Sequence, residues 1–240
     1  QKRDDRVPYV TARRNRLILD WHGYKATPPT FLGVKVVDNI SLAELEPLID
    51  WTPFFRTWDL VGKYPRILED EHIGEAAREV FDEARAMLKR IIAEKWLSAR
   101  GVIGFWPANS VRDDDITLYQ DEFRTGPIAT LHCLRQQMPR QPGRANMSLA
   151  DFVAPEESGV ADYVGAFAVS VGAEVDEIAR RFEAANDDYN AIMVKTLADR
   201  LAEAFTERMH QLVRTTHWGY ATDEALDNDA LIAEKYSGIR

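Results

Sequence analysis

The change of hydrophobic period along the chain constrains its fold more than any other feature of the sequence. In residues 73–92, apolar side chains recur every three or four positions, which is the spacing of an amphipathic helix. A longer segment at about 188–213 repeats this spacing, with Leu197, Leu201 and Phe205 on one stripe. Between the two segments, short β-branched and aromatic runs indicate strands at residues 102–106, 116–119, 131–134 and 163–171.

The order of these segments favours an α+β protein. Helical segments precede and follow the strands instead of alternating with them, and short polar loops favour antiparallel pairing. We expect Pro107 to end the strand that starts at residue 102, and residues 109–115 to form a polar loop. A further strand at 31–37 and helices at 42–48, 174–186 and 231–236 are also expected. The predicted fold is a central twisted, mainly antiparallel sheet flanked by helices.

Local signals mark the start of the helix expected at 42–48. Ser41 is a good helix N-cap, and Glu44 three residues later completes a capping box. The connection that follows, residues 50–60, is unusually aromatic for a segment between two elements, with two tryptophans and two phenylalanines. The sequence does not show by itself what these rings contact.

Charge and cysteine content exclude several classes of function. The net charge is -9 and no basic stripe with interleaved aromatics is present, so we expect no nucleic-acid partner. No run of about 18 apolar residues occurs, which predicts no transmembrane helix and no membrane partner. Residues 2–6 are charged with no apolar stretch behind them, and Cys133 is the only cysteine, so neither a secretory signal nor an internal disulfide is expected. These features favour a cytoplasmic protein.

Motifs of common catalytic and nucleotide-binding sites are absent from the sequence. It contains no GxGxxG turn, no phosphate loop of the GxxxxGK[ST] type and no GxSxG elbow. The histidines show no metal-ligand spacing, and His132 and Cys133 are adjacent, so they point to opposite faces of a strand. The three aspartates at 113–115 are more typical of a solvated turn than of a cation site. The sequence therefore predicts no metal site, and none of these motifs supplies a catalytic residue.

Ten short strings give the strongest functional indication, because they occur in a fixed order over nearly the whole chain after residue 16. They are IDWTPFF (49–55), GKYP (62–65), GFWPANS (104–110), LRQQ (134–137), LADFVAP (149–155), YVGAF (163–167), DDY (187–189), ADRLAEA (198–204), WGYA (218–221) and GIR (238–240). In order and spacing they resemble the C-terminal activation domain of cobalamin-dependent methionine synthase. The resemblance implies a single C-shaped domain at 17–240, preceded by an interdomain linker or arm at 1–16. For that charged arm, a solvated tail is the other interpretation.

The resemblance also implies a function. In the family, the enzyme's cobalamin is occasionally oxidised to inert cob(II)alamin, and the activation domain then docks over the cobalamin-binding module and presents S-adenosylmethionine. A one-electron donor, flavodoxin in many bacteria, supplies the electron, and methyl transfer restores methylcobalamin. The chain is accordingly expected to be a monomeric module of a methyltransferase that is inactive alone.

The groups of S-adenosylmethionine suggest which residues bind it. A carboxylate suits its α-ammonium, and a guanidinium suits its carboxylate through two parallel hydrogen bonds. The family's ligand-contacting aspartate falls on Asp50, and the arginine of its R-x-x-x-G-Y motif falls on Arg240. Asp199 and Glu203 lie four residues apart on one helix face, where they either approach the ligand or the cobalamin module, or form a solvated surface.

The family's sequences continue beyond the string that ends at Arg240. We therefore expect the C-terminal part of the domain, with part of the ligand pocket, to be missing from this chain. That expectation leaves a second hypothesis open. In it, the chain is a stand-alone, non-catalytic docking or regulatory protein for a cobalamin protein or a flavodoxin.

Overall fold

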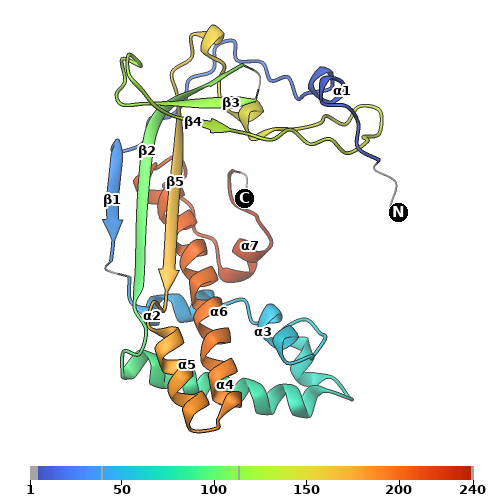
Figure 1. Ribbon diagram of the computed structural model, residues 1–240, viewed down its shortest axis with the longest axis vertical. Coiled ribbons are helices and arrows are strands. Elements are labelled where there is room, and N and C mark those ends of the chain that lie inside the picture. Colours follow the sequence, from blue (N-terminus) through green and yellow to red (C-terminus); the bar gives the residue numbers. More distant parts are fainter. Residues whose placement is uncertain (1–4, 39, 113, 239–240) are drawn as a thin grey trace. The chain divides into compact units, whose positions relative to one another are not determined.

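The computed structural model describes residues 5–38, 40–112 and 114–238 (Figure 1). The chain forms two compact units. Unit 1 contains the chain up to Val34 together with Gly104–Ala166, and unit 2 contains Lys35–Ile103 together with the chain from Phe167 onward. Arg240, the predicted partner of the ligand carboxylate, lies outside the described residues.

A five-stranded sheet runs through the chain, and Figure 1 shows β5 beside the long strand β2. The strands follow in the order β1 (Gly33–Val37), β2 (Ala99–Val111), β3 (Asp115–Tyr119) and β4 (Pro127–His132), while β5 (Asp162–Val171) pairs with β2. β3 is antiparallel to both β2 and β4, with Ile116 opposite Ser110 on one side and Leu131 on the other. The predicted α+β class, with antiparallel strand pairs among helices, is confirmed.

The length of β2 corrects one expectation. Pro107 does not end the strand, and residues 109–111 continue it instead of opening a loop. Asn109 and Ser110 are buried there, and their side chains donate to backbone carbonyls of residues 153–160 at 2.9 to 3.0 Å. Because these distant carbonyls satisfy the polar groups, a sequence that looks like a loop is stable as a strand. The expectation for β4 was also wrong in its bounds, since this strand covers Pro127–His132 instead of 131–134.

The N-terminal arm is bound to unit 1, so the solvated-tail interpretation is wrong for its described part. Helix α1 (Tyr9–Arg14) follows Pro8, and Tyr9 Oη donates to Asp114 Oδ2 at 2.5 Å. Asp114 also pairs with Arg135, whose fully buried guanidinium binds a second carboxylate, Asp151. The hydrogen bond to Asp114 raises the pKa of Tyr9 above its ordinary value. A linker role for residues 1–16 stays a prediction.

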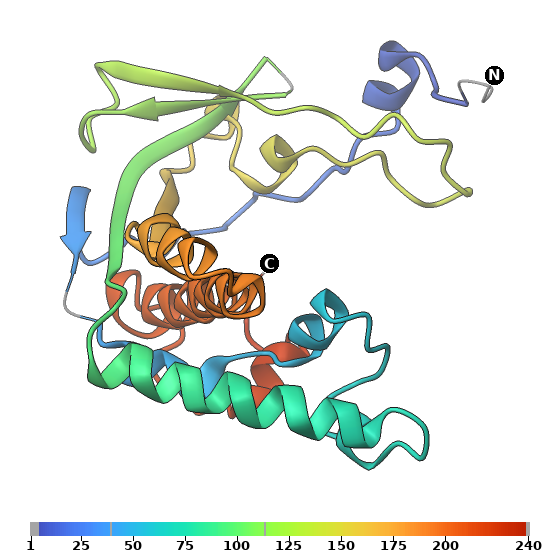
Figure 2. The same cartoon turned by 60° about the horizontal axis from the view of Figure 1, so that its bottom comes forward.

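Helices make up most of unit 2. They are α2 (Leu42–Leu45), α3 (Thr52–Thr57), α4 (Gly74–Ala93), α5 (Val175–Ala184), α6 (Asp188–Leu212) and α7 (Asn228–Ile232), with a π-helical turn at Val213–His217. Ser41 and Glu44 form the predicted capping box. The long helices α4 and α6, seen in Figure 2, pack against each other, and the predicted stripe of Leu197, Leu201 and Phe205 is fully buried.

The helices expected at 73–92, 174–186 and 188–213 are confirmed, whereas α7 begins before the expected residue 231. None of the helices in the described ranges is both long and apolar enough to cross a bilayer.

Candidate functional site

Asp50 lines a cavity of about 830 Å³ in unit 2. Three parts of the chain line this cavity: residues 49–52 with Arg56 around the start of α3, the loop at 61–66, and α7 together with Ala233 after it. Small-molecule sites in proteins have volumes of roughly 300–1,000 Å³. The geometry therefore places the predicted aspartate in a hollow large enough for a nucleoside-sized ligand.

Local hydrogen bonds fix the direction of the Asp50 side chain. Its Oδ1 accepts from the backbone N–H of Thr52 at 2.9 Å, a short-range bond that satisfies a free donor in the first turn of α3. Thr52 Oγ1 in turn accepts from the backbone N–H of Tyr64 at 3.2 Å, which joins this turn to the loop at 61–66. Within the described part of the chain, Asp50 Oδ2 accepts no hydrogen bond. One oxygen of a positioned carboxylate therefore remains able to accept from a ligand.

The aromatic residues that follow Asp50 form a ring cluster, of which Trp51 and Tyr64 line the cavity. Phe54 and Phe55 are completely buried, and the Trp51 ring packs edge-on against Phe54 and Phe81 with centroids 5.3 and 4.9 Å apart. Phe55 stacks on Tyr64 with an interplanar angle of 16°. Aromatic pairs in these arrangements contribute beyond the area that they bury. The unusual aromatic connection is therefore core, and it holds the two sides of the cavity together.

Three cations share the cavity with Asp50, and sequence reasoning did not single them out. Arg56, Lys63 and Arg66 line it, and none of them forms an ion pair with another described residue. A carboxylate or another anionic group of a ligand would meet counter-charges there. The GKYP string marked this loop through the resemblance, but the charges themselves carry no spacing signal, because they come from separate turns of the chain.

Asp199 and Glu203 share one face of α6 as expected. Both carboxylates accept hydrogen bonds from Arg200, which lies between them in the sequence. Arg200 is 7% exposed and donates to Asp199 Oδ2 at 2.6 Å and to both oxygens of Glu203 at 2.8 and 2.9 Å. Burial lowers the pKa of Arg200, but these hydrogen bonds outweigh it and leave the pKa above its usual value. Neither carboxylate lines the cavity beside Asp50. Their contact with a ligand or a cobalamin module stays a prediction.

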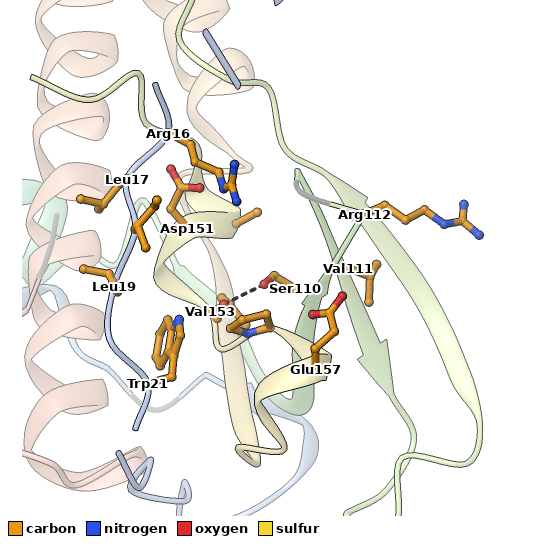
Figure 3. A pocket seen from close by; sticks show the side chains of 13 residues that line it. Arg16, Leu17, Leu19, Trp21, Ser110, Val111, Arg112, Asp151, Val153 and Glu157 are labelled. Atoms are coloured by element: carbon orange, nitrogen blue, oxygen red, sulfur yellow. Dashed lines mark hydrogen bonds between the residues drawn. The ribbon is translucent and has the colours of Figure 1, made fainter. Parts of the chain in front are cut away.

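A second, smaller cavity of about 340 Å³ lies within unit 1. Figure 3 shows Arg16 beside Asp151 at one end of it, with Leu17, Leu19 and Trp21 along the same segment and Arg112 directed away. Its buried polar groups are already engaged, since Asp151 pairs with Arg135 and Ser110 Oγ donates to Val153 O at 2.9 Å. Of the predicted site residues that the structure describes, Asp50, Asp199 and Glu203, none lines this cavity.

The two described aspartates of the run at 113–115 are engaged by other side chains of unit 1. Asp114 binds Arg135 and Tyr9, and Asp115 Oδ1 lies 2.8 Å from Nδ1 of His132. Residue 113 lies outside the described ranges. Within those ranges, no group of three or more histidine, cysteine or acidic side chains is placed to hold a metal ion.

The family model described as "Vitamin B12 dependent methionine synthase, activation domain" matches residues 41–240. The chain belongs to this family. A solved structure described as "Crystal Structure of the MetH Reactivation Domain bound to AdoHcy" is similar to it, with a TM-score of 0.93 and 54% sequence identity. The similarity covers 98% of this chain and 71% of that one. The resemblance inferred from the ten strings is confirmed.

Membership of the activation-domain family relates the chain to methionine synthase, which is a methyltransferase. It also gives the cavity beside Asp50 a context, because the IDWTPFF and GKYP strings that line it belong to the matched region. The individual ligand contacts are matters of proposal.

Proposed function

We propose that this activation domain binds S-adenosylmethionine in the cavity beside Asp50 and presents it for the reductive remethylation of cobalamin held by a neighbouring module. The observation that carries the proposal is a fixed carboxylate with one unengaged oxygen in a cavity of about 830 Å³. The AdoHcy bound by the 54% identical reactivation domain supports the ligand class.

The residues of the cavity fit the groups of the ligand. Asp50 suits the α-ammonium. The three cations Arg56, Lys63 and Arg66 suit the carboxylate, with Arg240 as the arginine that the family resemblance adds. Apolar surface from Trp51, Tyr64 and Ile232 suits the adenosine. Bound S-adenosylmethionine supplies an electrophilic methyl group. The chain's own residues bind it, orient it and need no general acid or base.

The partners follow from this role. The methyl acceptor is held by the cobalamin-binding module of the same enzyme, and the electron comes from flavodoxin or another one-electron donor. The isolated chain would then be inactive alone, because it holds only the methyl donor. A monomeric state and a cytoplasmic location remain predictions from the sequence.

Calorimetric titration of the complete protein that the gene encodes, and of the 240-residue chain, tests the proposal. Asp50→Asn should weaken S-adenosylmethionine binding roughly 10- to 100-fold, since a charge-assisted hydrogen bond is lost. Asp59→Asn is the matched control, because this exposed aspartate lies beyond the cavity lining on the same segment and loses the same charge.

A second ligand sharpens the result. 5′-Methylthioadenosine lacks both the ammonium and the carboxylate, so its affinity should be insensitive to Asp50→Asn. Equal effects of Asp50→Asn on both ligands would remove Asp50 from the ammonium site. Failure of the complete protein to bind S-adenosylmethionine would overturn the function.

A further inference from the structure

A single buried arginine holds both ends of the segment that carries α7. Arg214 lies in the π-helical turn after α6 and is 2% exposed. Its Nε and Nη2 donate to the two carboxylate oxygens of Glu224 at 2.6 and 2.8 Å. The guanidinium also lies 4.3 Å from the centroid of the Tyr236 ring, a cation–π distance. Glu224 precedes α7 and Tyr236 follows it, so these three residues, the Arg214 clamp, fix both flanks of the helix.

Helix α7 connects the Arg214 clamp to the Asp50 cavity. Its residues Asn228 and Ile232 line the cavity, and Leu231 between them is 2% exposed and anchors the helix. The helix is 5 residues long. Isolated helices shorter than about 12 residues are marginal in water, so the position of α7 depends on contacts outside the helix. The Arg214 clamp supplies such contacts on both sides.

We propose that the Arg214 clamp positions α7 as a wall of the S-adenosylmethionine cavity, which makes Arg214 a positioning residue for ligand binding. The inference rests on the proposed function. The residue type supports it, because the planar guanidinium bonds both carboxylate oxygens while its face covers an aromatic ring, and lysine cannot do both. The π-helical turn is a second support, since such turns occur frequently at functional sites.

The energetics of the buried Arg214–Glu224 ion pair also favour a positioning role over a purely stabilising one. A buried ion pair is often no more stabilising than an apolar cluster of the same volume. Arg214 and Glu224 have side chains only 3% and 5% exposed, so both charges are removed from water. A directional pair does, however, specify where the chain around residue 224 must lie.

The test measures two quantities on the complete protein, at a temperature where every variant is folded. They are the Kd for S-adenosylmethionine from calorimetry and the stability of the ligand-free protein from urea denaturation. Arg214→Lys and Glu224→Gln should weaken binding about tenfold or more, because α7 is no longer held in place. Tyr236→Leu removes the ring face over the guanidinium and should weaken binding as Arg214→Lys does. Phe205→Leu is the control, a core change on α6 whose side chain does not line the cavity.

Weaker binding by the Arg214 and Glu224 variants, with an unchanged Kd for an equally destabilised Phe205→Leu, would support the inference. Unchanged binding in all of them would overturn it. If the unmodified protein does not bind S-adenosylmethionine, the proposed function fails. The Arg214 clamp is then tested separately by amide hydrogen exchange in and just after α7. The amides of Leu231 and Lys235 donate to backbone carbonyls in and before α7. They should exchange faster in Arg214→Lys than in Phe205→Leu, and equal exchange would overturn the clamp.

Discussion

Replacing Arg135 by methionine should destabilise unit 1 more than any surface change in the chain. The Arg135 side chain has no exposed surface, and its guanidinium donates to Asp114 and Asp151 and, at 2.7 Å, to the carbonyl of Asn146. The side chains of Asp114 and Asp151 are themselves only 10% and 3% exposed. Methionine has a similar length but no donors, so both carboxylates would stay buried without a counter-charge.

The size of the loss follows from this burial. Removing one partner of a buried ion pair costs about 3–5 kcal/mol, because the remaining charge is neither solvated nor paired. For a protein of this length that corresponds to a fall in Tm of roughly 10 °C. Tyr9 donates to the same Asp114, so the arm helix α1 should loosen together with the ion cluster.

Urea denaturation measures the change in the free energy of unfolding. Unfolding is followed by tryptophan fluorescence and by circular dichroism, and the two transition curves should coincide if unfolding is two-state. Arg181→Met is the control, because its pair with Glu177 is 71% and 63% exposed and should contribute less than about 1 kcal/mol. A loss below about 1 kcal/mol for Arg135→Met would refute the reasoning. It would mean that water reaches the cluster or that the carboxylates find other partners.

Three smaller predictions concern single contacts. Tyr9→Phe removes the hydroxyl that donates to Asp114 and should lower the free energy of unfolding by about 1 kcal/mol in urea titration, with no change expected if the arm is loosely held. Gly172→Ala should cost about 1–3 kcal/mol in the same assay, because φ is +87° and an added Cβ would lie 3.3 to 3.4 Å from three neighbouring side chains; a neutral result would show that the turn adapts. Hydrogen bonds from Ser98 hold the pKa of Glu174 below its ordinary value, so the stabilising contribution of Glu174 is present above that value and is lost as the pH falls through the lowered pKa. Ser98→Ala should therefore flatten the acid limb of stability against pH, and an unchanged limb would contradict this origin.

Local signals were sufficient for most of the secondary structure. Ser41 and Glu44 cap α2 through bonds that span only three residues, so the cap could be read from the sequence. The apolar stripe through Leu197, Leu201 and Phe205 gave α6 its buried face, because a period of three to four residues places those side chains on one side of any helix. The continuation of β2 past Pro107 could not be read in this way, since the carbonyls that satisfy Asn109 and Ser110 come from residues 153–160.

The candidate site likewise contains local features that the sequence predicts and long-range features that it does not. Asp50 could be predicted because the string around it resembles the family, and its bond to Thr52 is local. The roles of the cavity cations (Arg56, Lys63 and Arg66) and of α7 could not be predicted, because these parts come from separate segments of the sequence that fold together around one cavity. Asp199 and Glu203 could be placed on one helix face, but their engagement by Arg200 depends on how that guanidinium is buried.

The sequence by itself determined the long helices, most of the strands, the α+β class and the family, because these depend on short-range hydrogen bonding, periodicity and ordered motifs. Only the tertiary structure decided which charged residues are buried and which partners they bind. Arg135, Arg200 and Arg214 look alike in the sequence, yet each is buried and paired with acidic partners within its own unit. The physical reason is that removing a charge from water is tolerated only where a partner is already positioned, and the fold as a whole sets that position.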